Sequence, residues 1–307
     1  MEQQKKKNKS ADSKDPGQDV QPVSAPGRLS GVVPHIAIQG VEGCFHQQAA
    51  NYFFGKSVGV ECCTTFKEVI TAAKDKNRTD GCIMAIENSI AGSILPNYNL
   101  IQGSNLKIVG EVYMQIHQNL LVNQGVELED IKEVHSHTMA LQQCYEFLDR
   151  YKWKLVESDD TALSARHIAQ YKSKHIAAVA SSLAADIYGL KVIAPKIQTL
   201  KKNYTRFLVL KRPEDVETPQ KGNKASINFQ AIHKEGSLAR VLGVIAIHKV
   251  NLSKLQSFPI PGSAFKYQFH ADMEFDNIET FEKVIKKIKA FTEDIKIYGI
   301  YNKGIWK

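Results

Sequence analysis

Short apolar segments alternate with segments of helical periodicity over most of this chain, and this alternation limits the fold more than any other feature. Apolar runs of about five residues are typical of covered strands, and the longer amphipathic segments are typical of helices. Such an alternation predicts a parallel sheet with helices on both faces. The first strands are expected at His35–Ile38, Val58–Cys62 and Cys82–Ile86, and the first helices at Cys44–Phe54, Phe66–Lys74 and Ile90–Gln102.

The alternation is interrupted once and then returns. Extended segments joined through His117 look like a crossover into a second lobe, and the chain comes back through Ile197 and Gln198. Two α/β lobes with a double crossing make a hinged cleft like that of periplasmic binding proteins. We therefore expect a two-lobed domain over residues 34–212. The second lobe is expected to contain strands at Glu133–His135, Trp153–Glu157, His175–Ala180 and Lys191–Ile193, and helices at Met139–Tyr151, Thr161–Ala169 and Ser181–Tyr188.

The pattern changes after a charged, proline-containing linker at residues 213–223. From residue 224 to residue 307 the segments follow the order β–α–β–β–α–β, which is the ferredoxin-like arrangement. At the other end of the chain, residues 1–33 are rich in Lys, Gln, Ser, Asp and Pro and contain almost no large apolar side chain. This composition predicts a disordered basic tail.

The composition is that of an ordinary soluble globular chain. The 307 residues, 43% of them hydrophobic, are enough for more than one domain, yet no apolar run approaches the ~18–20 residues that span a bilayer. The lysines near the N-terminus precede no apolar stretch, so no secretory signal is predicted. Five cysteines without a C-x-x-C pair favour reduced thiols and a cytoplasmic location.

The net charge of +8 is compatible with an anionic partner. The basic residues are scattered and form no dense stripe with interleaved aromatic residues, which argues against nucleic acid. No third ligand stands at metal-binding spacing from His135 and His137, and no glycine-rich phosphate loop is present. We therefore expect no metal, no cofactor and no membrane partner, and an anionic organic substrate held by hydrogen bonds.

Small polar residues follow several of the predicted strands. Glu87, Asn88 and Ser89 come directly after a covered strand, where α/β proteins place ligand contacts. Asn88 or Ser89 would equally cap the next helix, and the two roles are compatible. Gly40 and Gly43 suit a tight turn before a helix whose free amides attract an anion.

The stretch from Asn203 to Leu210 places an amide, a phenol, a hydroxyl and a guanidinium directly before an apolar strand, Phe207–Leu210. These groups are expected at the mouth of the strand, where ligands bind. Because a strand has a period of two, Thr205 and Arg206 reach one cleft only if the segment before Phe207 is irregular. The alternative interpretation is a turn that enters a strand, with Arg206 as a solvated charge.

Five segments of the chain resemble the prephenate dehydratase family with its C-terminal ACT domain. The resemblance extends from about His35 to the C-terminus. Each segment alone is modest, but five in this order, followed by a ferredoxin-like domain, are specific. The segments are Gly40–Ala50, Glu87–Gly92, Ser136–Cys144, Asp160–Ala162 and Asn203–Phe207.

This resemblance implies conversion of prephenate to phenylpyruvate with release of carbon dioxide and water. In the family the threonine of the Thr-Arg-Phe motif is thought to act on the substrate hydroxyl, which implies that Thr205 is an oriented hydrogen-bond donor here. Arg206 would hold a carboxylate or brace the loop. The resemblance further implies substrate contacts from Gly43, Asn88, Ser89, Thr161, Asn203 and Phe207.

Two segments depart from the family's pattern. In Gly43–His46 a thiol and an imidazole replace two hydroxyls of the family. The effector segment, usually Glu-Ser-Arg-Pro, reads Gln-Ser-Phe-Pro at Gln256–Pro259 and lacks the charge pair. We still expect a phenylalanine effector site, and the alternative is an ACT domain that serves dimerisation alone. The expected effector residues are Gly236, Ser237, Leu238, Gln256, Ser257 and Pro259.

The sequence thus predicts a cytoplasmic, feedback-regulated prephenate dehydratase that forms a homodimer or a homotetramer. One alternative is an arogenate dehydratase, which uses the amino analogue of prephenate. Another is a catalytically inactive amino-acid-binding sensor on the same fold. The sequence assigns no role to His46, His117 or His137.

Overall fold

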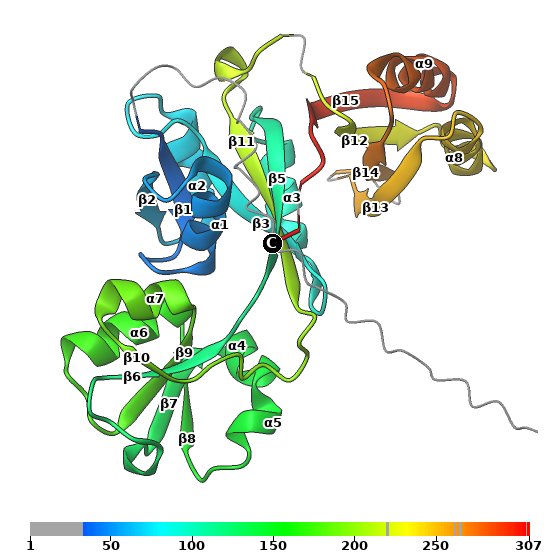
Figure 1. Cartoon of the computed structure of the whole chain (residues 1–307). Coiled ribbons are helices and arrows are strands. Elements are labelled where there is room, and N and C mark those ends of the chain that lie inside the picture. The colour runs from blue at the N-terminus through cyan, green and yellow to red at the C-terminus, as the bar shows by residue number, and fades with distance from the viewer. Residues whose placement is uncertain (1–32, 219–220, 261, 264–265, 305) are drawn as a thin grey trace, which may run out of the picture.

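The computed structural model describes residues 33–218, 221–260, 262–263, 266–304 and 306–307. The predicted tail at residues 1–33 lies outside the described residues except for Val33, and so do residues 219–220 of the predicted linker. The chain folds into three sheets, each packed against helices (Figure 1). They are called here the first, the second and the C-terminal sheet. The predicted α/β class is confirmed, but the pairing within the sheets differs from the prediction.

The first sheet has the strand order β2-β1-β3-β11-β5, and β4 pairs with β3 outside this path. Strand β1 runs parallel to β2 and β3, whereas β11 runs antiparallel to β3 and β5. The sheet is therefore mixed and not parallel, because β11 brings the chain back from the second sheet in the opposite direction. Its elements are β1 (His35–Gln39), α1 (Phe45–Phe54), β2 (Gly59–Cys63), α2 (Phe66–Lys74), β3 (Cys82–Asn88), β4 (Gly92–Ser93), α3 (Leu95–Gln102), β5 (Lys107–Gln115) and β11 (Tyr204–Lys211).

The second sheet has the strand order β10-β6-β9-β7-β8 and is also mixed. Strand β7 is parallel to β8 and β9, while β6, which receives the chain from β5, is antiparallel to β9 and β10. The chain thus passes twice between the two sheets, as predicted. The elements are β6 (Asn119–Val122), β7 (Glu133–His137), α4 (Thr138–Gln143), α5 (Tyr145–Leu148), β8 (Lys154–Ser158), α6 (Thr161–Gln170), β9 (Ile176–Ala180), α7 (Ser182–Tyr188) and β10 (Lys191–Ala194).

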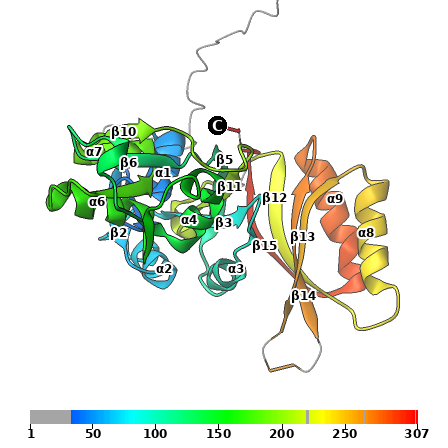
Figure 2. The same cartoon turned by 90° about the horizontal axis from the view of Figure 1, so that it is seen from below.

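The C-terminal sheet is antiparallel, with the strand order β13-β14-β12-β15. Its elements follow each other in the predicted β–α–β–β–α–β order, and both helices cover the face that points away from the first sheet (Figure 2). Strand β15 crosses β5 closely: a Cβ atom on Gly299 would lie 1.9 Å from the carbonyl oxygen of Ile108. The elements are β12 (Lys224–Ala231), α8 (Ser237–Ile247), β13 (Asn251–Pro259), β14 (Tyr267–Glu274), α9 (Ile278–Ile288) and β15 (Thr292–Tyr301).

The two faces of the first sheet belong to different hydrophobic clusters. Phe207 and Val209 of β11 pack with α1 and with alanines of α6 and α7. Leu208 and Leu210, the alternate residues, pack with α2, α3 and aromatic side chains of the C-terminal sheet. One face of β11 therefore meets the second sheet's region and the other meets the C-terminal sheet, as the two-residue period of a strand requires.

The helix predicted at Ile90–Gln102 begins only at Leu95, and Asn88 does not cap it. The Oδ1 atom of Asn88 instead accepts hydrogen bonds from the backbone N–H groups of Ile90 and Ala91, each at 2.9 Å. This tight turn leads into β4, which pairs with the end of β3. The hydrogen bonds to the Asn88 side chain thus stabilise a turn where the first turn of the helix was predicted.

The helix predicted at Met139–Tyr151 is divided at Cys144 into α4 and α5. The cause is a long-range contact. The carbonyl oxygen of Gln143 accepts a hydrogen bond at 2.8 Å from the N–H of Thr199, which lies on the segment returning to the first sheet. That carbonyl is diverted to the returning segment, and no local pattern in the sequence records this.

Candidate active site

Strand β11 carries the polar stretch predicted to hold the chemistry, and it begins three residues earlier than expected, at Tyr204. Thr205 and Arg206 therefore both lie inside the strand and point to opposite faces, so no irregular segment of β11 brings them together. Thr205 is 9% exposed and lies opposite Asn88 of β3. The Nδ2 atom of Asn88 donates a hydrogen bond to Thr205 Oγ1 at 3.0 Å.

Two more of the predicted site residues, Asn203 and Ser89, lie around this pair. Asn88 Nδ2 also lies 2.7 Å from Asn203 Oδ1, to which it donates. Ser89 and Tyr204 exchange two hydrogen bonds, because the N–H of Ser89 donates to the Tyr204 carbonyl at 2.8 Å and the N–H of Tyr204 donates to Ser89 Oγ at 2.9 Å. The hydroxyl of Thr205 is thus held in a frame of amide groups at the adjoining ends of β3 and β11.

The frame is tied to the second sheet's region through Asn203, which is fully buried. Its Nδ2 atom donates to Gln143 Oε1 of α4 at 2.9 Å, and its carbonyl oxygen accepts from the N–H of Ile116, just after β5, at 2.7 Å. Asn203 therefore touches both chain crossings between the first and second sheets. Any movement between the two sheets changes the surroundings of Asn88 and Thr205.

Arg206 lies on the opposite face of β11, toward the C-terminal sheet. Its guanidinium donates to Glu111 of β5 at 2.7 Å and forms an ion pair with Asp272 of β14. Burial alone would lower the pKa of Arg206 and raise that of Asp272, but the attraction between them holds the Asp272 pKa well below its usual range and the Arg206 pKa well above it. The structure thus separates Arg206 from Thr205, in accordance with a bracing role.

Lys224 of β12 extends this buried ionic contact. Its Nζ atom lies 3.0 Å from Glu111 Oε1 and 2.9 Å from Tyr113 Oη. Glu111, a charged residue in the middle of the largely apolar strand β5, is the signal that the sequence contained for this cluster. Glu111, Lys224 and Asp272 were not singled out, because the sequence does not show which strand lies against which.

Gly43 and Thr161 lie where α1 meets the second sheet's region. The carbonyl oxygen of Gly43 accepts from Ser181 Oγ at 2.6 Å, and a Cβ atom on Gly43 would lie 2.8 Å from Ala184 Cα. Thr161 is the buried first residue of α6, whose cap, Asp160, lies close to Gly40. Burial raises the pKa of Asp160. Among the described contacts, the hydrogen bonds linking Asn88, Asn203 and Thr205 do not include Gly43 or Thr161.

Phe207 is 1% exposed and packs beneath the site, edge-on to His46 with the ring centroids 5.2 Å apart. His46 Nε2 accepts a hydrogen bond from the N–H of Ala85 at 3.2 Å, and burial lowers the His46 pKa to about 4. His46 is therefore neutral at pH 7 and supports the sheet. The imidazole that replaces a hydroxyl of the family has thus become part of the core.

The other two histidines lie on the second sheet's side. His117 Nδ1 is 3.2 Å from Gln198 Nε2, and its pKa is lowered by burial and by the charges of Lys196 and Lys201. His137 caps α4, since its Nδ1 atom accepts from the N–H of Met139 at 3.2 Å. Gln198, a buried residue on the returning chain crossing, was not predicted as part of the site.

Trp306 and Lys307 reach the same region from the C-terminal sheet. Trp306 stacks on Tyr113 with centroids 4.5 Å apart and meets Tyr204 edge-on at 5.0 Å. The N–H of Lys307 donates to the Tyr113 carbonyl at 2.9 Å, and its carbonyl oxygen accepts from the N–H of Gln115 at 2.8 Å. The two residues add a short pairing to the edge of β5 beside the candidate site.

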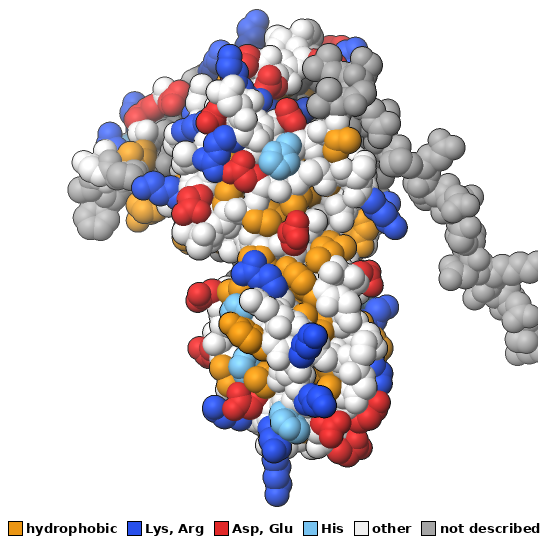
Figure 3. Space-filling view, turned by 90° about the vertical axis from the view of Figure 1, so that its left-hand side faces the viewer, with side chains coloured by type: hydrophobic (Ala, Val, Ile, Leu, Met, Phe, Trp, Pro, Cys, Tyr) orange, Lys and Arg blue, Asp and Glu red, His pale blue; other side chains and the backbone are white. Residues whose placement is uncertain are grey.

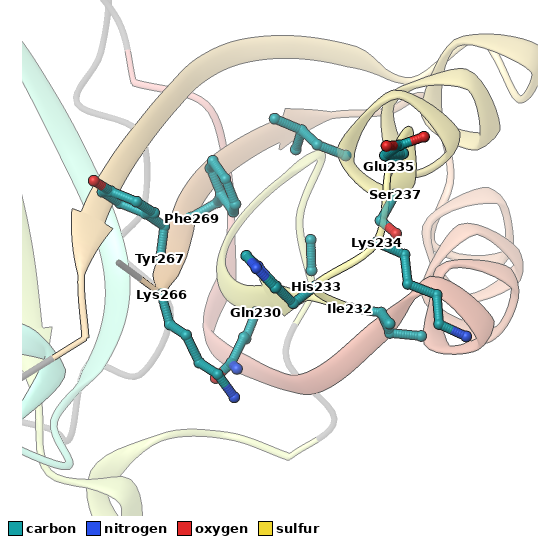
Figure 4. A pocket seen from close by; sticks show the side chains of 11 residues that line it. Gln230, Ile232, His233, Lys234, Glu235, Ser237, Lys266, Tyr267 and Phe269 are labelled. Carbon is teal, nitrogen blue, oxygen red and sulfur yellow. The ribbon is translucent and has the colours of Figure 1, made fainter. Parts of the chain in front are cut away.

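A separate pocket of about 600 Å³ lies in the C-terminal domain (Figure 4). Of the predicted effector residues, Ser237 and Leu238 line it, and Gly236 is the cap of α8 with a φ of 74° that favours glycine. Gln256, Ser257 and Pro259 lie on β13, an edge strand, and do not line it. The pocket is also lined by Gln230, His233, Lys234, Lys266, Tyr267 and Phe269.

Seen from outside, hydrophobic side chains gather along the boundary between the regions of the first and the second sheet (Figure 3). No helix among the described residues is long and apolar enough to cross a membrane.

The fold and the site define a mixed α/β protein with a hydroxyl and amide site at the strand ends of its first sheet. The chain belongs to the prephenate dehydratase family, which matches residues 36–215.

Individual relatives support this assignment. The chain is 36% identical over 278 residues to arogenate dehydratase/prephenate dehydratase 2, chloroplastic, of Arabidopsis thaliana, and the match covers 87% of this chain and 72% of that protein. Two solved structures are also similar, each over 87% of this chain. One, described as GqqA, a novel type of quorum quenching acylase, has a TM-score of 0.79, 28% identity and 97% coverage of its own chain. The other, prephenate dehydratase of Arthrobacter aurescens in complex with L-Phe, has a TM-score of 0.77, 24% identity and 90% coverage.

Proposed function

We propose that this chain is a lyase of L-phenylalanine biosynthesis that converts prephenate to phenylpyruvate, carbon dioxide and water without a cofactor. The observation that carries the proposal is the hydrogen bond from Asn88 to Thr205 inside a chain that belongs to the prephenate dehydratase family. The reaction is thermodynamically favourable, because loss of the ring carboxylate and the ring hydroxyl of prephenate makes the ring aromatic. The enzyme has to help the hydroxyl leave.

The geometry suits Thr205 as the donor to that hydroxyl. A threonine hydroxyl has one proton and two acceptor positions, and the Asn88 amide occupies one acceptor position. The amide orientation is fixed, since Asn88 Oδ1 accepts from two backbone N–H groups. The Thr205 proton is left for the departing oxygen, in a site from which water is largely excluded. The electron pair of the breaking C–C bond enters the ring as carbon dioxide leaves. The departing hydroxide accepts the hydrogen bond from Thr205 and takes one proton from solvent to become water, so that Thr205 keeps its own proton.

The substrate carboxylates need partners other than Arg206, whose guanidinium is engaged by Glu111 and Asp272. We assign them to the N-terminal region of α1, where Cys44 provides no capping side-chain hydrogen bond, and to Ser89 and Thr161. Gly43 at this turn lets α1 approach α7 closely. The proposed catalytic domain, residues 34–212, is accordingly two-lobed, and its lobes close over the substrate by a hinge at the two chain crossings.

We propose that residues 224–307 form an ACT domain that binds L-phenylalanine. The β–α–β–β–α–β order and the pocket beside Ser237 and Leu238 support this proposal, and a similar structure was solved with L-Phe. Gln256, Ser257 and Pro259 on the edge strand β13 are assigned to the same effector site in a homodimer or homotetramer. The alternative is a domain that serves assembly alone.

The test is ultraviolet detection of phenylpyruvate from purified protein and prephenate, with and without L-phenylalanine. Product that is suppressed by L-phenylalanine supports both the activity and the effector site. Product that is indifferent to L-phenylalanine keeps the activity and leaves the C-terminal domain an assembly module. A parallel assay with arogenate distinguishes the arogenate dehydratase alternative.

Absence of turnover on both substrates would overturn the proposal and favour an amino-acid-binding sensor. Acylase activity is assayed beside it, because one similar structure is described as an acylase. Acylase turnover without phenylpyruvate would replace the proposed reaction. Cytoplasmic location is proposed with the activity and is checked by fractionation of cells that produce the protein.

A further inference from the structure

The two strands that supply Thr205 and Asn88 present a second pair of residues to the opposite face. In the pairing of β11 with β3, Thr205 lies opposite Asn88 and Arg206 lies opposite Glu87. Successive side chains of a strand alternate between its faces. The hydroxyl and amide pair is therefore backed, one residue along each strand, by a pair of charged side chains.

Both charged residues are held by the C-terminal sheet. Arg206 forms its ion pair with Asp272 of β14, and both side chains are buried. On the neighbouring strand, Lys254 of β13 places its Nζ atom 2.5 Å from Glu87 Oε1 and 2.5 Å from Ser93 Oγ. The C-terminal sheet thus forms an ion pair with each of the two strands that form the site.

The strand pairing between these contacts is irregular. Opposite Arg206 stands Glu87, but opposite Phe207 stands Ala85, so Ile86 is an extra residue in β3. A bulge of this kind interrupts the hydrogen-bond ladder and redirects nearby side chains. Because the ladder alone does not set the positions of Thr205 and Asn88, contacts behind the strands carry part of that function.

We propose that Asp272 and Lys254 are positioning residues, which hold Arg206 and Glu87 from behind and so set the placement of Thr205 against Asn88. This inference rests on the proposed function for its kinetic consequence. It gives the C-terminal domain a direct route to the catalytic step, through two ion pairs on adjacent strands. A change in the tilt of the C-terminal sheet moves both strands together.

The variant Lys254→Met tests the inference, because the Glu87 carboxylate that it leaves without this partner is 31% exposed and can be hydrated. We expect kcat for prephenate to fall about tenfold, since a small displacement of a catalytic group is costly, while KM changes less than about twofold. Lys254→Arg should restore kcat to within about twofold, because arginine also pairs with a carboxylate.

Lys296→Met is the matched control. Lys296 of β15 also bridges to the first sheet's region, where its Nζ atom donates to the Gln102 carbonyl at the end of α3 at 3.3 Å. This variant loses a bridging lysine without touching β3 or β11, and its kcat should match that of the wild type. Equal kcat values for Lys254→Met, Lys296→Met and wild type would overturn the inference.

A double-mutant comparison separates the ion pair from general loosening. If Lys254 acts through Glu87, then Lys254→Met combined with Glu87→Gln should lower kcat no further than Glu87→Gln alone. Full additivity of the two effects would show that Lys254 acts by another route and would contradict the inference.

Hydrogen–deuterium exchange of the peptide covering Asn203–Phe207 provides a readout that needs no turnover. Exchange should be faster in Lys254→Met than in wild type or Lys296→Met, because the strands are held less firmly. If wild type is inert toward prephenate and arogenate but exchange responds as stated, the proposed function fails and the positioning role stands. Unchanged exchange in Lys254→Met overturns the positioning role whether or not the protein turns over prephenate.

Discussion

The first sheet meets its two neighbours through junctions of different chemistry. Toward the second sheet the contacts are neutral: Ser181 Oγ donates to the Gly43 carbonyl at 2.6 Å, and Tyr188 Oη donates to the Glu42 carbonyl at 2.7 Å. Alanines of α6 and α7 fill the space between. Toward the C-terminal sheet the contacts are ionic and buried, with Arg206 at their centre.

This difference in contact chemistry indicates which of the two junctions has hydrogen bonds or ion pairs that part at the lower cost in free energy. Water replaces a neutral hydrogen bond at small net cost, typically about 1 kcal/mol, so the hydrogen bonds between the first and second sheets oppose their separation only weakly. Parting a buried ion pair leaves a charge without a partner at a cost of about 3–5 kcal/mol. In the proposed closure we therefore expect the first sheet and the C-terminal sheet to stay joined, while the second sheet moves against them.

Breaking the charged junction should have the largest effect. Asp272→Asn removes the carboxylate that pairs with Arg206. The free energy of unfolding, measured by urea titration, should fall by about 3–5 kcal/mol. The stabilisation is present above pH ~3.9, the carboxyl pKa of the unfolded chain, and is lost as pH falls toward the depressed pKa of Asp272 in the folded state.

Glu274→Gln is the control for this experiment. Glu274 pairs with Lys224 and Lys303 at the rim of the same sheet and is partly exposed, so its loss should cost less than about 1 kcal/mol. Equal losses for the two variants would show that the junction is not held by its buried charge.

Acid should destabilise the fold through His46, which packs on the face of the first sheet that meets the second sheet's region. The unfolded chain protonates His46 near pH 6.5, whereas burial lowers the folded-state pKa to about 4. The unfolded state therefore binds more protons between these values, and the free energy of unfolding should fall by ~3 kcal/mol from pH 7 to pH 4 through this residue. His46→Gln should remove that part of the pH dependence.

Urea unfolding at several pH values measures the effect as the difference between wild type and variant. His167→Gln, at an exposed position of α6, controls for the mere loss of a histidine. A wild-type curve that runs parallel to that of His46→Gln would contradict the assignment.

At the site itself, Thr205→Ala should lower kcat about a hundredfold, or ~2.7 kcal/mol of barrier, with KM largely unchanged. In the proposed mechanism the Thr205 hydroxyl acts mainly in the transition state, while the binding contacts stay in place. Thr205→Ser, which keeps a hydroxyl, should recover most of the rate. Full turnover by Thr205→Ala would remove Thr205 from the mechanism.

The smallest effect is expected where the neutral junction closes. Ser181→Ala removes the hydrogen bond to Gly43 and the cap of α7, and should raise KM several-fold, corresponding to ~1 kcal/mol, with little change in kcat. Ser182→Ala, at an exposed neighbouring position, is the control. A change in kcat without a change in KM would place Ser181 in the chemical step instead of in closure.

The sequence was sufficient for most of the order of elements and for the position of several polar residues near strand ends. Asn88, Ser89, Asn203 and Thr205 were predicted as polar groups beside buried strands, and the structure brings them together. Such predictions succeed because burial and alternation are local properties of a strand.

The features that the sequence did not predict depend on contacts between residues far apart in the chain. Arg206 was expected to hold a carboxylate, to brace the loop or to be solvated, and its buried partner Asp272, 66 residues away, was not predicted. The break at Cys144 comes from Thr199, and the mixed pairing of the sheets comes from the returning strand β11. Local patterns state which face a side chain occupies, but not which element covers that face.

The placement of the two tryptophans gives the molecule an optical probe of its own. Trp306 touches Tyr204, the residue before Thr205, while Trp153 stacks on Tyr151 in the second sheet's region, with ring centroids 3.9 Å apart. Emission from Trp306 therefore reports on the segment that carries the proposed catalytic hydroxyl, whereas emission from Trp153 reports on the second sheet's region. With a single Trp153→Phe change, the state of that segment becomes readable by steady-state fluorescence without any attached dye.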